Sequence, residues 1–208
     1  MKLGTLIRVT DPDRTNEGFA RLAAMGFNSC QLGYKPEVFT KAAASKIREA
    51  ADRNGIEISA HFCGYRDDRQ IYDLKYGFCV NGLSPAAYRA QRLDYLFRGA
   101  EFDQWLGITD MIIHAGFIPN NPFDSEYPAL VAAVRQLATY SKSLGINILF
   151  ETGAESPVVL LRLIEEVGTG NLYVNLDTGN ALMYGYANPV DALYTYGKYV
   201  RNIHGKDG

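Results

Sequence analysis

The chain has 208 residues, of which 47% are hydrophobic and 21% are charged, and its formal net charge at pH 7 is −2. A chain of this length and composition can bury one large core, so we expect one domain spanning residues 1–208. The near-neutral charge, with Lys and Arg scattered along the sequence, gives no basic surface for a polyanion. Nucleic acid is therefore not an expected partner.

Neither a membrane segment nor a disulfide framework is indicated. No run approaches the roughly 20 apolar residues that a membrane helix needs, and Met1 leads directly into a strand-like segment instead of a leader. Cys30, Cys63 and Cys79 are odd in number and lie in no Cys-x-x-Cys spacing, which favours reduced thiols over disulfides or a thiolate metal site. We expect a cytoplasmic protein that does not bind a membrane.

Short β-branched runs alternate with segments of helical periodicity along the whole chain. Seven runs are predicted as strands, in chain order: 3–9, 27–33, 56–63, 108–115, 146–152, 172–178 and 200–206. The helices between them carry start and stop signals. Proline follows a capping residue at Ser84-Pro85, Ser156-Pro157 and Asn188-Pro189, and glycine ends two helices, at Gly26 and Gly145.

Strands that alternate with helices imply a parallel sheet, either open or closed into a barrel. Polar side chains decide between the two, because alternation puts several of them on one face of a strand. These sets are Glu57, Ser59 and His61; Asn147, Leu149 and Glu151; Tyr173, Asn175 and Asp177; and Asn202, His204 and Lys206. Apolar helices would cover both faces of an open sheet, whereas a barrel interior that opens at its C-terminal mouth accommodates polar groups. We predict seven strands of an eight-stranded barrel, with ordered lids at 64–83 and 116–125.

Five ionisable residues fall at the predicted C-terminal ends of strands. Three are the histidines of the chain, His61, His114 and His204, and two are the carboxylates Glu151 and Asp177. The carboxyl ends of parallel barrel strands meet at one mouth, so these side chains are expected to approach one another. A mixed oxygen and nitrogen donor set suits Mn²⁺, Mg²⁺, Co²⁺ or Zn²⁺.

Six short segments carry a resemblance to a known family. In order, they are GFNSCQLG, ISAHF, IIHAG, LFETG, VNLDTGN and NIHGKDG. Together they resemble the xylose isomerase-like barrel superfamily, in particular its sugar-phosphate isomerase/epimerase branch. The resemblance implies an α/β fold, a (β/α)8 TIM barrel that lacks its last strand in this chain. It also implies a divalent metal held by Glu151, Asp177 and His204, with a fourth ligand on the eighth strand, beyond residue 208.

The same resemblance implies the chemistry of the site. Members of the branch remove a proton next to a carbonyl through an enediolate, which a divalent cation stabilises. Glu151 is the candidate base, and His61 and His114 are expected to line the pocket. Lys206 and Arg8 are candidates for contacts to the oxygens or phosphate of a small sugar.

Two positions depart from the family pattern. Gln31 stands where a glutamate is frequent, and Asn180 stands where many members have a histidine. Asn180 is therefore a less certain substrate contact than the histidine it replaces.

Two other functions remain open on the same scaffold. An endonuclease IV-like DNA repair hydrolase would place three zinc ions on His61, His114, Glu151, Asp177 and His204. A barrel that binds a ligand without turnover is the second alternative. An absent eighth strand would leave the first and seventh strands with open edges, so the chain is expected either to self-associate as a homo-oligomer or to be less stable than the complete barrel. Weaker metal binding is also expected, because a ligand is lost.

Overall fold

The computed structural model describes residues 2–34, 38–64, 71–73, 78–153 and 155–207. Its main sheet has seven strands in the order β1-β2-β3-β6-β7-β8-β9, and every neighbouring pair is parallel. The strands are β1 (Gly4–Val9), β2 (Ser29–Tyr34), β3 (Glu57–Phe62), β6 (Asp110–Ile113), β7 (Asn147–Glu151), β8 (Leu172–Asp177) and β9 (Val200–His204). All seven predicted strand segments are confirmed.

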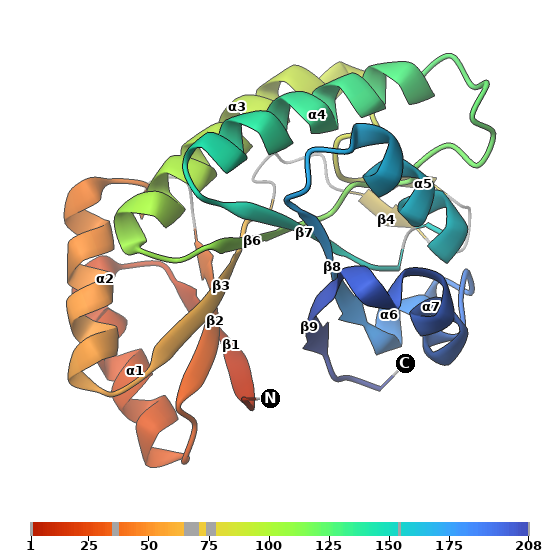
Figure 1. Ribbon diagram of the computed structural model, residues 1–208. Coiled ribbons are helices and arrows are strands. Elements are labelled where there is room, and N and C mark those ends of the chain that lie inside the picture. Colours follow the sequence, from red (N-terminus) through yellow and green to blue (C-terminus); the bar gives the residue numbers. More distant parts are fainter. Residues whose placement is uncertain (1, 35–37, 65–70, 74–77, 154, 208) are drawn as a thin grey trace.

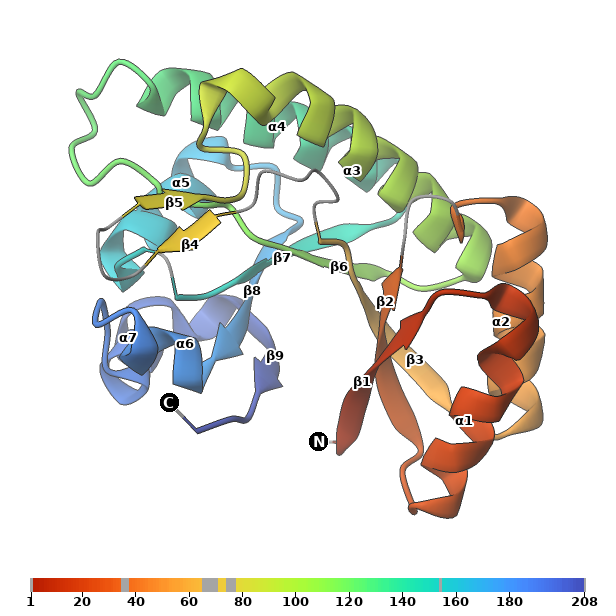
Figure 2. The same ribbon diagram turned by 180° about the vertical axis from the view of Figure 1, so that it is seen from behind.

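Helices cover the convex side of this sheet, which curls into part of a barrel (Figures 1 and 2). They are α1 (Thr15–Ala24), α2 (Lys41–Arg53), α3 (Ala86–Leu106), α4 (Tyr127–Ser143), α5 (Pro157–Val167), α6 (Thr178–Met183) and α7 (Pro189–Tyr196), with 3-10 turns η1 (Pro12–Arg14) and η3 (Gly197–Tyr199). The predicted parallel barrel architecture without an eighth strand is seen in the described residues, with β1 and β9 as the two edges of the curled sheet. Among the described residues, no helix has the length and apolar character to cross a membrane.

The core has two layers because strand side chains alternate between the two faces of the sheet. The larger layer lies between strands and helices and contains side chains such as Leu32 and Phe150. The smaller layer lies inside the barrel, where Ala60, Ile112 and Leu149 are fully buried and contact one another. The inner layer leaves the C-terminal mouth to polar groups.

Two of the three predicted helix starts are confirmed, because Ser156 and Asn188 are the N-cap residues of α5 and α7 and a proline follows each as the first helical residue. Asn188 accepts a hydrogen bond from the Val190 N–H through its side chain, whereas the side chain of Ser156 makes no capping hydrogen bond. Ser84 does not cap α3, because the helix begins after Pro85 and the Ser84 hydroxyl instead donates to the carbonyl of Ala115.

Both connections predicted as lids contain ordered residues. In the segment 64–83, β4 (Ile71–Asp73) and β5 (Phe78–Val80) form an antiparallel hairpin, which the sequence did not predict. Residues 65–70 and 74–77 of this segment lie outside the described part of the chain. The loop 116–125 is held by Arg162, which donates hydrogen bonds to two of its backbone carbonyls.

A one-residue bulge in β3 changes which side chains face the barrel interior. Cys30 of β2 is paired with Ile58, but the next residue, Gln31, is paired with Ala60, so Ser59 is the extra residue. A one-residue shift exchanges the two faces of a strand. The prediction that Glu57, Ser59 and His61 share the inner face is therefore wrong for His61.

Candidate metal centre and active site

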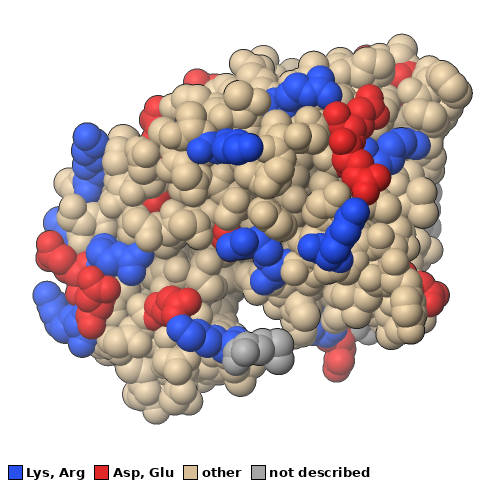
Figure 3. Space-filling model, in the orientation of Figure 1, with Lys and Arg blue, Asp and Glu red and all other residues tan. Residues whose placement is uncertain are grey.

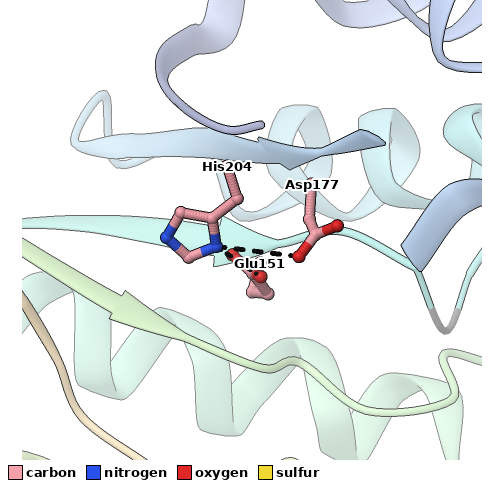
Figure 4. Close-up of side chains that lie close together, drawn as sticks. All are labelled: Glu151, Asp177 and His204. Atoms are coloured by element: carbon pink, nitrogen blue, oxygen red, sulfur yellow. Dashed lines mark hydrogen bonds and ion pairs between the residues drawn. The ribbon is translucent and has the colours of Figure 1, made fainter. Parts of the chain in front are cut away.

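Glu151, Asp177 and His204 end three neighbouring strands, β7, β8 and β9, at one edge of the sheet. Asp177 and His204 are paired directly in the β8–β9 register, and Glu151 is paired with Asn175 two residues before Asp177. One potential ligand atom from each of the three side chains lies within 4.8 Å of the other two (Figure 4). The geometry thus brings together the three residues that the sequence predicted as a group.

The imidazole of His204 lies between the two carboxylates. Its Nδ1 is 2.8 Å from Glu151 Oε1 and 3.7 Å from Asp177 Oδ2 (Figure 4). Both carboxylates are buried, whereas His204 is partly exposed to the cavity. Two carboxylate oxygens and one imidazole nitrogen form a hard, mixed donor set that suits Mg²⁺, Mn²⁺, Co²⁺ or Zn²⁺.

Asp177 stays ionised because donors surround its carboxylate. Asp177 is the N-cap of α6, and its Oδ1 accepts a hydrogen bond of 2.7 Å from the Asn180 backbone N–H. On the other oxygen, Lys206 Nζ lies 3.1 Å from Oδ2. Burial alone would raise the pKa of Asp177, but hydrogen bonds to His204, Glu151, Asn180 and Lys206 outweigh burial and hold that pKa well below its usual range. Asp177 therefore offers a permanent negative charge.

The pKa values of Glu151 and His204 are both raised, but for different reasons. Burial raises the pKa of Glu151 to about 7, although the nearby His204 opposes this shift. Burial alone would lower the pKa of His204, but hydrogen bonds to Asp177 and Glu151 outweigh it and raise the pKa to about 9. A carboxyl group that titrates near neutral pH can both accept and return a proton.

Two side-chain amides that the sequence did not assign to the site contact this group. Gln31 Oε1 of β2 lies 2.6 Å from His204 Nε2, and Asn175 Nδ2 donates a hydrogen bond to Glu151 Oε2. Both amides are buried. Strand alternation placed Asn175 on the same face as Asp177, which was the available signal for Asn175, whereas Gln31 stood out only as a departure from the family pattern.

A cavity of about 1790 Å³ contains the site and extends between the edge strands β1 and β9. The rings of Phe62 and His204 lie nearly parallel, at 21° with centroids 6.0 Å apart, and His114 meets the Phe62 ring edge-on at 5.7 Å. Burial lowers the pKa of His114 to about 4, so its ring is neutral at physiological pH. Phe62, which the sequence did not predict, gives the cavity an apolar surface.

The three remaining predicted contacts also line this cavity. Lys206 Nζ donates to Asn180 Oδ1 at 2.6 Å, and Asn180 Nδ2 donates to the carbonyl of Thr152. Arg8 of β1 is exposed on the opposite side of the opening. Cationic and amide groups thus surround the three candidate ligands.

His61 does not line the cavity, which corrects the prediction for this residue. The β3 bulge turns it toward the helices, where it is fully buried and its Nδ1 lies 2.6 Å from Asp103 Oδ1 of α3. Its ring packs edge-on against Phe39 and Phe102. His61 therefore belongs to the layer between sheet and helices.

Comparisons with known proteins agree with the fold. A family profile described as xylose isomerase-like TIM barrel matches residues 19–208. The structure is similar to that of a xylose isomerase domain protein from Planctomyces limnophilus, with 29% identity and a TM-score of 0.88, covering 98% of this chain and 72% of the other. A comparison with curated proteins finds no match.

Two epimerase structures share the fold at lower identity. A D-psicose 3-epimerase in the presence of D-fructose has 20% identity and a TM-score of 0.70, covering 98% of this chain and 72% of the other. A 3-keto-D-glucoside 4-epimerase from E. coli has 15% identity and a TM-score of 0.75, covering 98% of this chain and 78% of the other.

Proposed function

This chain belongs to the xylose isomerase-like TIM barrel family, and from that membership we propose that it is a divalent-metal-dependent isomerase or epimerase of a sugar or sugar phosphate. The observation that carries the proposal is the convergence of Glu151, Asp177 and His204 at the mouth of the barrel. The reaction is removal of a proton from a carbon next to a carbonyl, through an enediolate of the substrate.

The donor set fits a divalent ion. Glu151, Asp177 and His204 supply oxygen and nitrogen ligands, and Asp177 is kept negative by its hydrogen bonds. Because no sulfur donor takes part, Mn²⁺, Mg²⁺, Co²⁺ and Zn²⁺ are the candidate ions. When bound, such an ion would supply positive charge next to the oxygens on which negative charge develops.

Glu151 is the proposed base. Its burial against Asn175 and His204 removes the carboxyl from water and raises its pKa to about 7, so the carboxylate takes up a substrate proton more readily than an exposed glutamate does. In an isomerisation, the protonated carboxyl returns the proton to the neighbouring carbon, and a proton moves between the two enediolate oxygens. In an epimerisation, a second acid on the opposite face protonates the original carbon, because return of the proton by Glu151 to the same face would restore the substrate. The family resemblance assigns that second acid to a glutamate on the eighth strand.

The other cavity residues are proposed to bind and orient the sugar. The ring of Phe62 offers an apolar face to C–H groups, and neutral His114 can exchange hydrogen bonds with hydroxyl groups. Lys206 and Arg8 can bind a carbonyl oxygen, a hydroxyl group or a phosphate, and Asn180 positions Lys206.

The DNA repair alternative receives less support. A three-zinc cluster of that kind uses both His61 and His114, but His61 faces α3, on the far side of the sheet from Glu151. On the face in Figure 3, basic and acidic side chains of described residues are interspersed, and no broad basic surface for a nucleic acid is seen there. The non-catalytic alternative is separated from an enzyme by a direct test of turnover.

That test is exchange of a carbon-bound hydrogen with solvent. The protein is incubated in D2O with Mn²⁺, Mg²⁺, Co²⁺ or Zn²⁺ in turn and a panel of ketoses, aldoses and their phosphates, and deuterium incorporation next to the carbonyl is followed by NMR. We expect incorporation and product from at least one sugar, and loss of both when the metal is chelated. Absence of incorporation across the panel with each of the four metals would contradict the proposed function.

Glu151→Gln is the variant that tests the base. It keeps the size of the side chain but removes its negative charge and its basicity, so we expect at least about 100-fold slower incorporation. Circular dichroism and thermal unfolding serve as controls for the fold. A rate near that of the parent would remove Glu151 from the mechanism.

A further inference from the structure

We propose that two buried amides, Gln31 and Asn175, are positioning residues that determine which atoms of His204 and Glu151 face the metal. The proposal rests on the metal centre of the proposed function. Neither amide belongs to the predicted ligand set, and they come from different strands, β2 and β8.

The four side chains form one hydrogen-bonded row across the barrel mouth. Gln31 contacts His204 through Nε2, His204 contacts Glu151 through Nδ1, and Glu151 contacts Asn175 through Oε2. His204 and Glu151 lie in the middle of the row, and each has one side-chain atom in contact with an amide and another in contact with the other of the two. The atoms used toward the amides are therefore unavailable to a metal, whereas His204 Nδ1 and Glu151 Oε1 remain near Asp177.

For His204, the consequence is a fixed ring nitrogen. The amide oxygen of Gln31 can only accept a hydrogen bond, so the nitrogen 2.6 Å from it carries the proton. A histidine that binds a metal has one nitrogen as ligand and the other as donor, and the partner of the donor nitrogen selects the arrangement. Gln31 thereby assigns the proton to Nε2 and leaves Nδ1 for the metal.

For Glu151, the consequence is a fixed carboxylate orientation. Asn175 is fully buried, its Nδ2 donates to Oε2, and its Oδ1 has no hydrogen-bond partner among the described residues. A buried amide that leaves one polar atom unpaired is costly, which argues that its remaining contact is useful. Without the Asn175 donor, Oε2 would lose its partner and the carboxylate could turn.

Zn²⁺ affinity of the purified chain, measured by calorimetry after removal of bound metal, tests both amides. Gln31→Met keeps the length of the side chain but removes the acceptor, and Asn175→Leu keeps the volume but removes the donor. We expect each to weaken Zn²⁺ binding by about 10- to 100-fold. Gln31→Glu restores an acceptor for Nε2–H, so it should bind Zn²⁺ more tightly than Gln31→Met.

Asn171→Leu is the matched control. Asn171 is likewise buried, its Oδ1 has no hydrogen-bond partner in the part of the chain that the structure describes, and its Nδ2 donates to two backbone carbonyls away from the site. This variant should lose stability but keep the parent Zn²⁺ affinity. Equal loss of affinity in Asn171→Leu and Asn175→Leu would show that affinity follows stability, which would overturn the role of Asn175.

The second measurement does not depend on any variant folding. In the Zn²⁺-loaded parent, ¹⁵N–¹H correlation of the His204 ring should show a proton on Nε2 and none on Nδ1. A proton on Nδ1, or unchanged affinity in Gln31→Met, would overturn the role of Gln31. Failure to bind Zn²⁺ at all would overturn the whole inference. Because neither measurement uses a sugar, the inference can hold while the proposed reaction fails, and the two failures are distinguishable.

Discussion

Burial makes the Glu155 carboxyl a weaker acid than an exposed glutamate. This residue lies four positions after Glu151, is only 6% exposed, and precedes α5. Burial raises its pKa to about 8 against a hydrogen bond from the Gly153 backbone, and the nearby Glu151 adds to the increase. The raised pKa favours the protonated form of Glu155 in the folded protein at neutral pH.

A pH dependence of stability follows from this shift. Because the folded pKa of Glu155 is raised, the folded state binds the proton more tightly than the unfolded state does, and its stability contribution is complete below pH 4.5. That contribution is lost as the pH rises toward 8, by on the order of a few kcal/mol. Urea unfolding at a series of pH values should show this decline, with a smaller decline in Glu155→Gln. A parallel decline in both proteins would contradict the assignment.

Sequence reasoning identified the candidate ligand residues but not the two amides that contact them. Glu151, Asp177 and His204 could be predicted because each ends a strand and parallel strands end at one mouth. The proposed role of Gln31 and Asn175 rests on hydrogen bonds whose partners depend on the curvature of the sheet. Strand alternation indicated the face of Asn175, and Gln31 departed from the family pattern, but neither signal distinguishes this proposed role from ordinary packing.

Strand and helix positions were predictable because the periodicity of apolar residues changes sharply between them. The face of His61 was not, because the β3 bulge arises from pairing with β2 and leaves no mark in the alternation of the strand itself. The β4–β5 hairpin was missed for another reason. Its strands have three residues each, too few to show a period.

The contact between β3 and α3 is proposed to support the fold instead of the reaction. His61 and Asp103 are both fully buried, and burial raises the pKa of Asp103 to about 6 although His61 opposes the increase. Removal of one member of a buried pair leaves the other without compensation. His61→Ala should therefore lower the free energy of unfolding by about 3–5 kcal/mol, as measured by urea denaturation.

Two controls accompany this prediction. Zn²⁺ affinity of His61→Ala should equal that of the parent under conditions where both are folded, because His61 faces away from the cavity. The double variant His61→Leu/Asp103→Leu should regain most of the lost stability, since apolar side chains can replace a buried pair. A large loss of Zn²⁺ affinity in His61→Ala would return this residue to the site.

The edges of the curled sheet give the 208-residue chain a surface for association. Within the described ranges, β1 and β9 each have one side with no paired strand, and Leu6 and Ile203 on them are 42% and 48% exposed. Exposed apolar edge strands pair readily with other chains. We expect concentration-dependent association of this chain in sedimentation velocity, reduced by Leu6→Lys and Ile203→Lys.

Val158→Lys provides the comparison for those variants. Val158 is 66% exposed on α5, so the substitution adds the same charge and removes a similar apolar group away from both edges. It should leave association unchanged. Equal effects of the three substitutions would mean that net charge, not the strand edges, controls association.

The hydrogen bond between Gln31 and His204 also has a consequence for the order of folding. It joins residues 173 positions apart, on strands that meet only after the intervening sheet has curled. Contacts of such long sequence separation bear the largest loop-closure entropy and form late. Glu151 and Asp177 can come together from adjacent strands, whereas the fixed imidazole requires nearly the whole chain. A fully oriented ligand set would then mark completion of the fold, and partly folded chains would compete poorly for metal ions in the cell.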